Sequence, residues 1–241
     1  MHATYRSVAP VPVGPRWIET HGENDMRPLD ELVNERESAL PTLTEWAAAA
    51  SGPCEILPSS DRCGDVLAAL QVSTRSTLGT VAYSTGGILA AGGFLRLLGS
   101  GHPRLPRDIV GWNDGRSSGF LLVADDAVGG FFALNGGALG EDTGSLYYLA
   151  PDTLQWEPLE IGYSDFVRWA LGEKPDDFYA GMRWPGWQAD VQHLTTDQCF
   201  SFYPFLWTKE GSVEHSSRKA IAVSELYALH LALRSGASPQ S

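Results

Sequence analysis

The sequence predicts an α+β domain in which an antiparallel-rich mixed sheet is flanked by helices. Residues 119–171 carry this prediction, because they read as a meander of strands closed by one helix. The apolar runs GFLLVA and FFALN have strand length, and the residues between them include Asp125, Asp126 and two glycines, a composition typical of a reversing chain. Helices predicted before this unit can cover one face of the sheet.

The rest of the central unit follows the same pattern. LYYLA, residues 146–150, predicts a third strand that is reached through a loop rich in glycine and acids, and residues 153–159 supply a short fourth strand. Ser164 is the expected N-cap of the closing helix. Gly172 is its expected stop.

Three short helices are predicted on the N-terminal side. Apolar residues at helical spacing place the first over residues 29–33. Thr42 and Glu45 have the spacing of a capping box, which predicts a second helix. Ser60 or Asp61 is expected to cap the third.

Short apolar segments punctuated by glycines predict small strands at residues 78–83, 87–91 and 93–98. The region 99–116 is dense in glycine and proline and predicts a long loop. Near the C-terminus, CFSFYPFLWT predicts a strand in which Pro204 cannot donate a ladder hydrogen bond, so we expect either an edge strand or a bulge at the proline. A polar loop at 209–219 and an amphipathic helix at 223–234 complete the prediction.

Composition favours a single globular domain. The chain has 241 residues, of which 43% are hydrophobic and 19% are charged, enough apolar material for one core. We expect this domain to span residues 26–235. The proline-rich residues 1–25 are expected to form a disordered extension, with Met26 as an alternative start, and residues 236–241 a disordered tail.

Charge and cysteine content restrict the surroundings of the protein. A net charge of -12 argues against nucleic-acid and anionic-membrane partners, because no basic stripe is present to neutralise phosphates. Three cysteines without a CxxC spacing fit a reducing compartment. No apolar run has the length of a membrane span and no signal-peptide pattern begins the chain, so a cytoplasmic location is expected.

The loop 99–116 offers one candidate pocket. His102, Arg104, Trp112 and Asn113 would converge there if the loop enclosed a substrate. The region lacks a P-loop lysine and a dinucleotide-binding glycine pattern, and the six histidines form no HxH or HExxH motif. We therefore expect no cofactor, no metal site and no assignable catalytic residue.

Acidic and aromatic residues offer a second kind of site. Asp125, Asp126, Glu141 and Asp142 are expected on two meander loops and would form a carboxylate patch if these loops converged. Two further candidates flank a proline and a glycine in the sequence WPGW, and half-exposed indoles are favoured at protein interfaces. These are Trp184 and Trp187.

Five stretches carry a resemblance to a known family: GSGHPRLPRDIVGWN, GFLLVADDAVGGFFALNGG, LYYLAPDTLQWEPL, YSDFVRWALG and SFYPFLWTKEGS. Over residues 26 to about 233 the chain resembles a bacterial family known as domain of unknown function 2625. This family has no assigned activity and no assigned catalytic residues, so the resemblance transfers neither to this chain. More remotely, the order and texture of these segments are similar to the SUKH superfamily of SMI1/KNR4-like proteins, which implies an α+β domain that acts by stoichiometric binding, commonly of a toxin domain.

Three functional hypotheses follow. The first is a non-enzymatic cytoplasmic binding protein, for example an immunity protein that neutralises a basic toxin domain by occlusion. The second is a small-molecule-binding protein or enzyme with its pocket under the loop 99–116. The third is an assembly protein that forms a homo-oligomer through the edge strand at Pro204.

Overall fold

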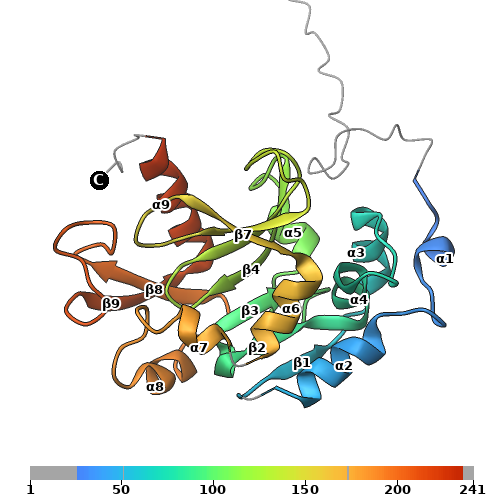
Figure 1. Cartoon of the computed structure of the whole chain (residues 1–241), viewed down its shortest axis with the longest axis horizontal. Helices are drawn as coiled ribbons and strands as arrows, with labels where there is room; N and C mark the ends of the chain where they lie inside the picture. The colour runs from blue at the N-terminus through green and yellow to red at the C-terminus, as the bar shows by residue number, and fades with distance from the viewer. Residues whose placement is uncertain (1–25, 51, 173, 236–241) are drawn as a thin grey trace, which may run out of the picture.

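The computed structural model describes residues 26–50, 52–172 and 174–235. The extension expected at residues 1–25 and the tail expected at 236–241 lie outside the described residues. The described chain forms a seven-stranded sheet, a separate two-stranded hairpin and helices packed around them (Figure 1). The predicted α+β class is confirmed, and every pairing between the described strands is antiparallel.

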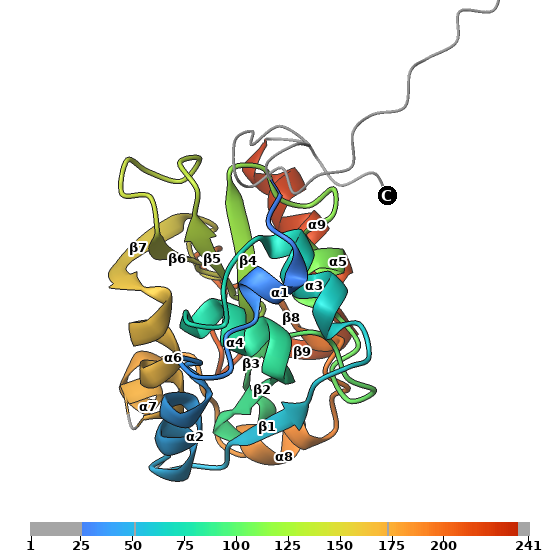
Figure 2. The same ribbon diagram turned by 90° about the vertical axis from the view of Figure 1, so that its right-hand side faces the viewer.

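The strands of the large sheet lie side by side in the order in which they occur in the chain. Figure 2 shows this progression from β7 to β1. The strands are β1 (Glu55–Pro58), β2 (Thr85–Ala90), β3 (Leu95–Leu98), β4 (Phe120–Asp126), β5 (Phe131–Asn135), β6 (Ser145–Leu149) and β7 (Trp156–Gly162). The separate hairpin consists of β8 (Gln198–Tyr203) and β9 (Ser217–Ala222).

The described helices are short. They are α1 (Leu29–Leu32), α2 (Leu40–Ala48), α3 (Cys63–Leu70), α4 (Thr77–Ser84), the 3₁₀ turn η1 (Ala91–Gly93), α5 (Ile109–Asn113), α6 (Tyr163–Leu171), α7 (Lys174–Phe178), α8 (Trp187–Gln192) and α9 (Val223–Arg234). Among the described residues, no helix has the length and apolar character that a membrane crossing requires.

Both faces of the sheet are covered. Consecutive side chains of a strand point to opposite faces, and β5 shows the result. Phe131 meets Tyr227 of α9 with ring centroids 4.8 Å apart, whereas Phe132 meets Phe166 of α6 at 4.9 Å. One layer therefore contains α6, and the opposite layer contains α9 with the β8–β9 hairpin, which Figure 1 shows together at one side of the molecule.

The strand predicted at residues 78–83 is wrong, because this segment forms α4. The side chain of Ser76 caps the helix by accepting the backbone N–H of Gly79 at 3.1 Å. Val81 and Ala82 are buried. The chain before α4 passes very close to Gly79, since a Cβ on this residue would lie 2.2 Å from the carbonyl oxygen of Ser73. Only glycine leaves room for this close approach.

Three predicted caps are also wrong. The helix expected to begin at Thr42 begins at Leu40, and neither Ser60 nor Asp61 is the N-cap of α3, which is Arg62. Ser164 lies inside the first turn of α6, where its hydroxyl oxygen is 2.7 Å from that of Thr77. The Ser164 hydroxyl therefore contacts α4 and does not cap α6.

The C-terminal hairpin differs from the prediction in one strand. β8 ends at Tyr203, directly before Pro204, whereas the predicted strand continues through the proline to Thr208. The predicted loop 209–219 contains the beginning of β9. α9 follows β9 and buries Leu226, Tyr227 and His230, which the helical pattern predicted.

The outer edge of β7 is irregular. Among the strands that the structure describes, β7 pairs with β6 alone, and the register shifts between Ser145 and Tyr147. Pro158 has no N–H to donate, and Glu160 has a left-handed backbone with φ of 55°. These features limit the regular ladder that the edge presents.

His230 yields a test of the packing between α9 and the sheet. Burial lowers its pKa from 6.5 to about 4, and its Nδ1 atom has no hydrogen-bond partner. Because the unfolded state binds the proton more tightly, the free energy of unfolding should fall as pH drops from about 6.5 to about 4, by roughly 3 kcal/mol. His230→Leu should remove this part of the pH dependence in urea denaturation.

His215 provides the matched control, since its side chain is exposed. His215→Leu should leave the slope of stability against pH close to that of the unaltered protein. An unchanged slope in His230→Leu would show that His230 is not the group responsible.

Candidate functional site

Asp125 lies in a buried network of ion pairs, and its predicted position on an exposed loop is wrong. Its side chain is 1% exposed; Arg96 Nη2 lies 2.6 Å from Oδ1, and Arg107 Nη1 lies 2.5 Å from Oδ2. Arg107 Nε lies 2.9 Å from Asp197 Oδ1. Arg96, which is equally buried, donates from Nη1 to the carbonyl oxygen of Gln198 at 2.5 Å. The network therefore ties β3 and β4 to the start of β8.

Asp126 is buried as well and holds the turn that follows β4. Its Oδ1 accepts the backbone N–H groups of Val128 at 3.1 Å and Gly130 at 2.7 Å. Its Oδ2 accepts the hydroxyls of Tyr148 at 2.8 Å and Tyr179 at 3.0 Å. Burial raises the pKa of Asp126, although these hydrogen bonds favour the charged form. Both aspartates belong to β4, and the turn itself is formed by residues 127–130.

Glu141 and Asp142 lie at the opposite end of the sheet. They follow β5, whereas residues 127–130 precede it, so an antiparallel pairing separates the two loops by the length of a strand. Both residues are exposed. Tyr147 donates its hydroxyl to Asp142 Oδ1 at 2.5 Å, and this bond lowers the pKa of Asp142. The predicted patch of four carboxylates therefore does not form.

The two tryptophans of the WPGW segment have different environments. Trp184 is 2% exposed and donates from Nε1 to Asp190 Oδ2 at 2.6 Å. The guanidinium of Arg218 lies 4.4 Å from its ring centroid. The expectation that Trp184 is half exposed is therefore wrong. Trp187 is partly buried, as expected, and lines a pocket.

The residues expected to converge under the loop 99–116 do not meet. His102 Nδ1 accepts the backbone N–H of Arg104 at 3.1 Å, and Arg104 Nη1 lies 2.5 Å from Glu55 Oε1 at the surface. Trp112 is buried, with the guanidinium of Arg116 4.6 Å from its ring centroid.

Asn113 is buried and joins α5 to β4. It donates from Nδ2 to the carbonyl oxygens of Ile109 and Leu122, and its Oδ1 accepts the backbone N–H of Leu122 at 2.7 Å. Neither of the two pockets described below is lined by Asn113 or by the other three residues.

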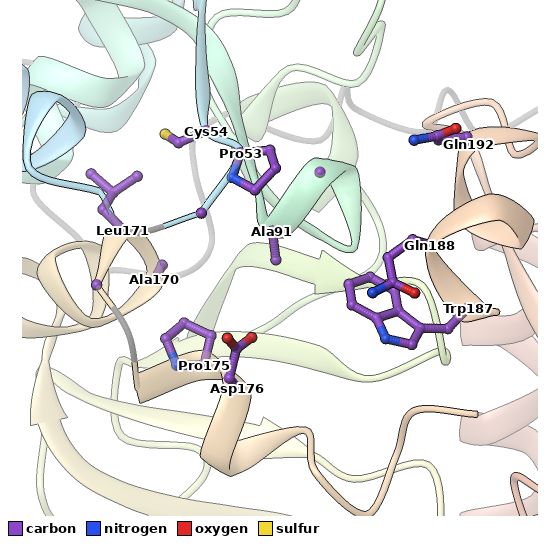
Figure 3. Close-up of a pocket in the computed structure, with 13 residues that line it drawn as sticks. Pro53, Cys54, Ala91, Ala170, Leu171, Pro175, Asp176, Trp187, Gln188 and Gln192 are labelled. Carbon is purple, nitrogen blue, oxygen red and sulfur yellow. The ribbon is translucent and has the colours of Figure 1, made fainter. Parts of the chain in front are cut away.

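A pocket of about 310 Å³ lies between the C-terminal end of α6, α7, α8 and η1 (Figure 3). Its volume is at the lower end of the range of roughly 300–1,000 Å³ found for small-molecule sites. Its apolar lining includes Pro53, Leu171, Pro175 and the indole of Trp187. Its polar side chains are Asp176, Gln188 and Gln192. A second cavity, beside His230, holds only about 10 Å³.

Trp187 is held rigidly at the wall of this pocket. Its ring meets Phe94 edge to face at 5.1 Å, and the guanidinium carbon of Arg183 lies 4.2 Å from its ring centroid. Arg183 Nη1 also lies 2.5 Å from Asp176 Oδ1. The carboxylate of Asp176 on the pocket wall is therefore already paired with a cation.

Cys54, which carries a free thiol, lies on the side of the pocket opposite Trp187 (Figure 3). Burial, assisted by the negative charge of Glu55, raises the pKa of this thiol above 9.0. Because the thiolate is the nucleophilic form, Cys54 is poorly reactive at neutral pH.

The pocket joins four segments that are far apart in the sequence. They lie around positions 52–54, 91–92, 170–176 and 187–192. No local motif indicates such a site, and only the WPGW segment drew attention to one of its residues. Among the described residues, no group of three His, Cys, Asp or Glu side chains is placed to hold a metal ion.

Fold and pocket together define an α+β protein with a site of small-molecule size. A family model described as "Protein of unknown function DUF2625" matches residues 29–226, and the chain belongs to this family. It is 46% identical over 213 residues to YbfG, an uncharacterised protein of Escherichia coli (strain K12), covering 87% of this chain and 98% of that protein. It is also 40% identical over 189 residues to an uncharacterised protein of Haemophilus influenzae, covering 75% and 83% of the two chains. No solved structure matches the chain. The resemblance to the SUKH superfamily therefore stays a prediction.

The buried network makes a prediction about stability. Asp125→Ala would leave Arg96 and Arg107 without their shared carboxylate, and removing one partner of a buried ion pair typically costs about 3–5 kcal/mol. Urea denaturation should therefore show a loss of this size in the free energy of unfolding.

The exposed pair of Asp165 and Arg168 gives the control, with atoms 2.9 Å apart and side chains 58% and 65% exposed. Asp165→Ala should cost less than about 1 kcal/mol. Equal effects of the two substitutions would contradict a structural role for the buried network.

Proposed function

We propose that this protein is a non-enzymatic cytoplasmic binding protein that holds a small molecule in the pocket formed by α6, α7, α8 and η1. The observation that carries this proposal is the pocket itself, which combines an apolar wall with a few polar side chains. A rigid indole and two flexible amides are the elements expected of a site that selects a ligand by shape and hydrogen bonding. The free cysteines Cys54, Cys63 and Cys199 support a reducing compartment.

Binding is favoured over catalysis by the state of the ionisable groups. Asp126, Tyr148 and Tyr179 have raised pKa values, but they are buried and bonded to one another. At the pocket, the carboxylate of Asp176 is paired with Arg183. Neither set offers an acid and a base facing a common substrate position.

A pocket-filling substitution tests this proposal. Gln188 is exposed on α8 and lines the pocket, so Gln188→Trp should occupy the space without altering the core. A panel of metabolites screened by thermal denaturation should contain compounds that raise the Tm of the unaltered protein. At one hundred times its Kd, a compound adds about 2.7 kcal/mol of stability.

Gln188→Trp should abolish this stabilisation. Gln155→Trp is the matched control, because Gln155 is exposed and lies outside the pocket. It should respond like the unaltered protein. Stabilisation that persists fully in Gln188→Trp would place the binding site elsewhere and overturn the proposal.

Binding of a basic protein partner is a second candidate function, and the net charge of -12 favours it. In this alternative the protein is an immunity protein that occludes the basic groove of a toxin domain. Of the carboxylates first considered, only Glu141 and Asp142 are exposed for such a contact. Asp142 is fixed within its loop by Tyr147 and Asn135, so Glu141 is the better residue to alter.

Affinity capture at low and high salt, with Glu141→Lys as the test variant, examines this candidate. A basic partner should be retained at low salt, released at high salt and held more weakly by Glu141→Lys, because opposite charges steer association. Glu35→Lys, an equal charge change at an exposed position near α1, should bind as the unaltered protein does. Equal retention by both variants would remove Glu141 from the interface.

A further inference from the structure

The described lining of the pocket between α6, α7, α8 and η1 carries polar groups but almost no net charge. Its carboxylate, Asp176, is bound through Oδ1 to Arg183 Nη1, so the two charges offset each other. The other polar side chains, Gln188 and Gln192, are neutral amides. A phosphate or carboxylate ligand would need an unpaired cation, and an ammonium ligand would need an unpaired acid. The described lining offers neither.

The contact between Trp187 and Arg183 argues independently against a cationic ligand. A cation is attracted to an aromatic face by the quadrupole of the ring, and the guanidinium of Arg183 already lies 4.2 Å from this ring centroid. A second cation at the same indole would meet repulsion from Arg183. The indole is nevertheless held firmly by Arg183 and Phe94, so it suits an apolar ligand face.

The hydrogen-bonding groups approach the pocket from different elements. Asp176 comes from α7, whereas Gln188 and Gln192 come from α8, one helical turn apart (Figure 3). Asp176 only accepts hydrogen bonds, and each glutamine both donates and accepts. A ligand that meets all three needs hydroxyl groups around its periphery. The polar atoms of a planar base all lie in the plane of its ring. Such a ligand meets these three side chains less well than one whose hydroxyls project in several directions.

We infer that the pocket binds a neutral polyol of the size of a simple sugar, with its C–H face against Trp187 and its hydroxyls on Asp176, Gln188 and Gln192. This inference rests on the proposed small-molecule function and names the ligand class of that site. The volume of about 310 Å³ limits the ligand to one or two sugar rings.

Isothermal titration of the full chain with named probes tests the ligand class. The probes are a panel of neutral mono- and disaccharides, adenosine, spermidine and inorganic phosphate. We expect saturable binding of at least one neutral saccharide and none of the other three. The double variant Gln188→Ala/Gln192→Ala should weaken this binding at least tenfold, and Gln155→Ala should leave it unchanged.

Alkylation of Cys54 by iodoacetamide at alkaline pH, where a larger share of its thiol is ionised, gives a second measurement. Cys54 lines the pocket, whereas Cys63 does not, so the bound saccharide should slow modification of Cys54 alone. Saturable binding of adenosine, spermidine or phosphate with protection of Cys54 would overturn the polyol inference and leave the proposed function standing. If no probe binds and the metabolite panel gives no stabilisation sensitive to Gln188→Trp, both the ligand class and the proposed function fail.

Discussion

The ion pair between Arg96 and Asp125 is the interaction on which the arrangement of this protein depends. Both side chains are 1% exposed, so their charges have lost almost all contact with water. Such burial is tolerated only where further hydrogen bonds and charges complete the pair. Arg107 adds a second cation to Asp125, and the carbonyl oxygen of Gln198 accepts from Arg96. The large sheet and the C-terminal hairpin are thereby joined at one point.

This junction also bears on the pocket. α8 immediately precedes the segment that enters β8, so fixing Gln198 restricts where the pocket wall formed by α8 can lie. On the other side, Trp187 is held by Phe94, which directly precedes β3. The strand that carries Arg96 therefore supports the hairpin and lies beside the pocket. The site is a product of tertiary packing, and each of its walls belongs to a different part of the chain.

The sequence predicted local structure better than it predicted the site. The sequence predicts β5, β6 and α9 correctly, because the spacing of their apolar residues is a local property of the chain. The sequence of segment 78–83 favours a strand although the segment forms α4, because its apolar residues are buried on several sides and show no clear helical period. The sequence places Asp125 in an exposed turn, because aspartate and glycine are typical of a reversing chain and aspartate normally avoids the interior. Its burial depends on Arg96 and Arg107, whose positions beside it only the folded chain reveals.

The irregular edge of β7 affects how the protein behaves when it is concentrated. A sheet with a regular open edge can recruit a strand from another copy and begin to aggregate. Pro158 removes one donor from this edge, and the left-handed Glu160 interrupts its geometry while adding charge. The edge of β7 therefore offers a poor template for strand addition, even when many copies of the protein are close together.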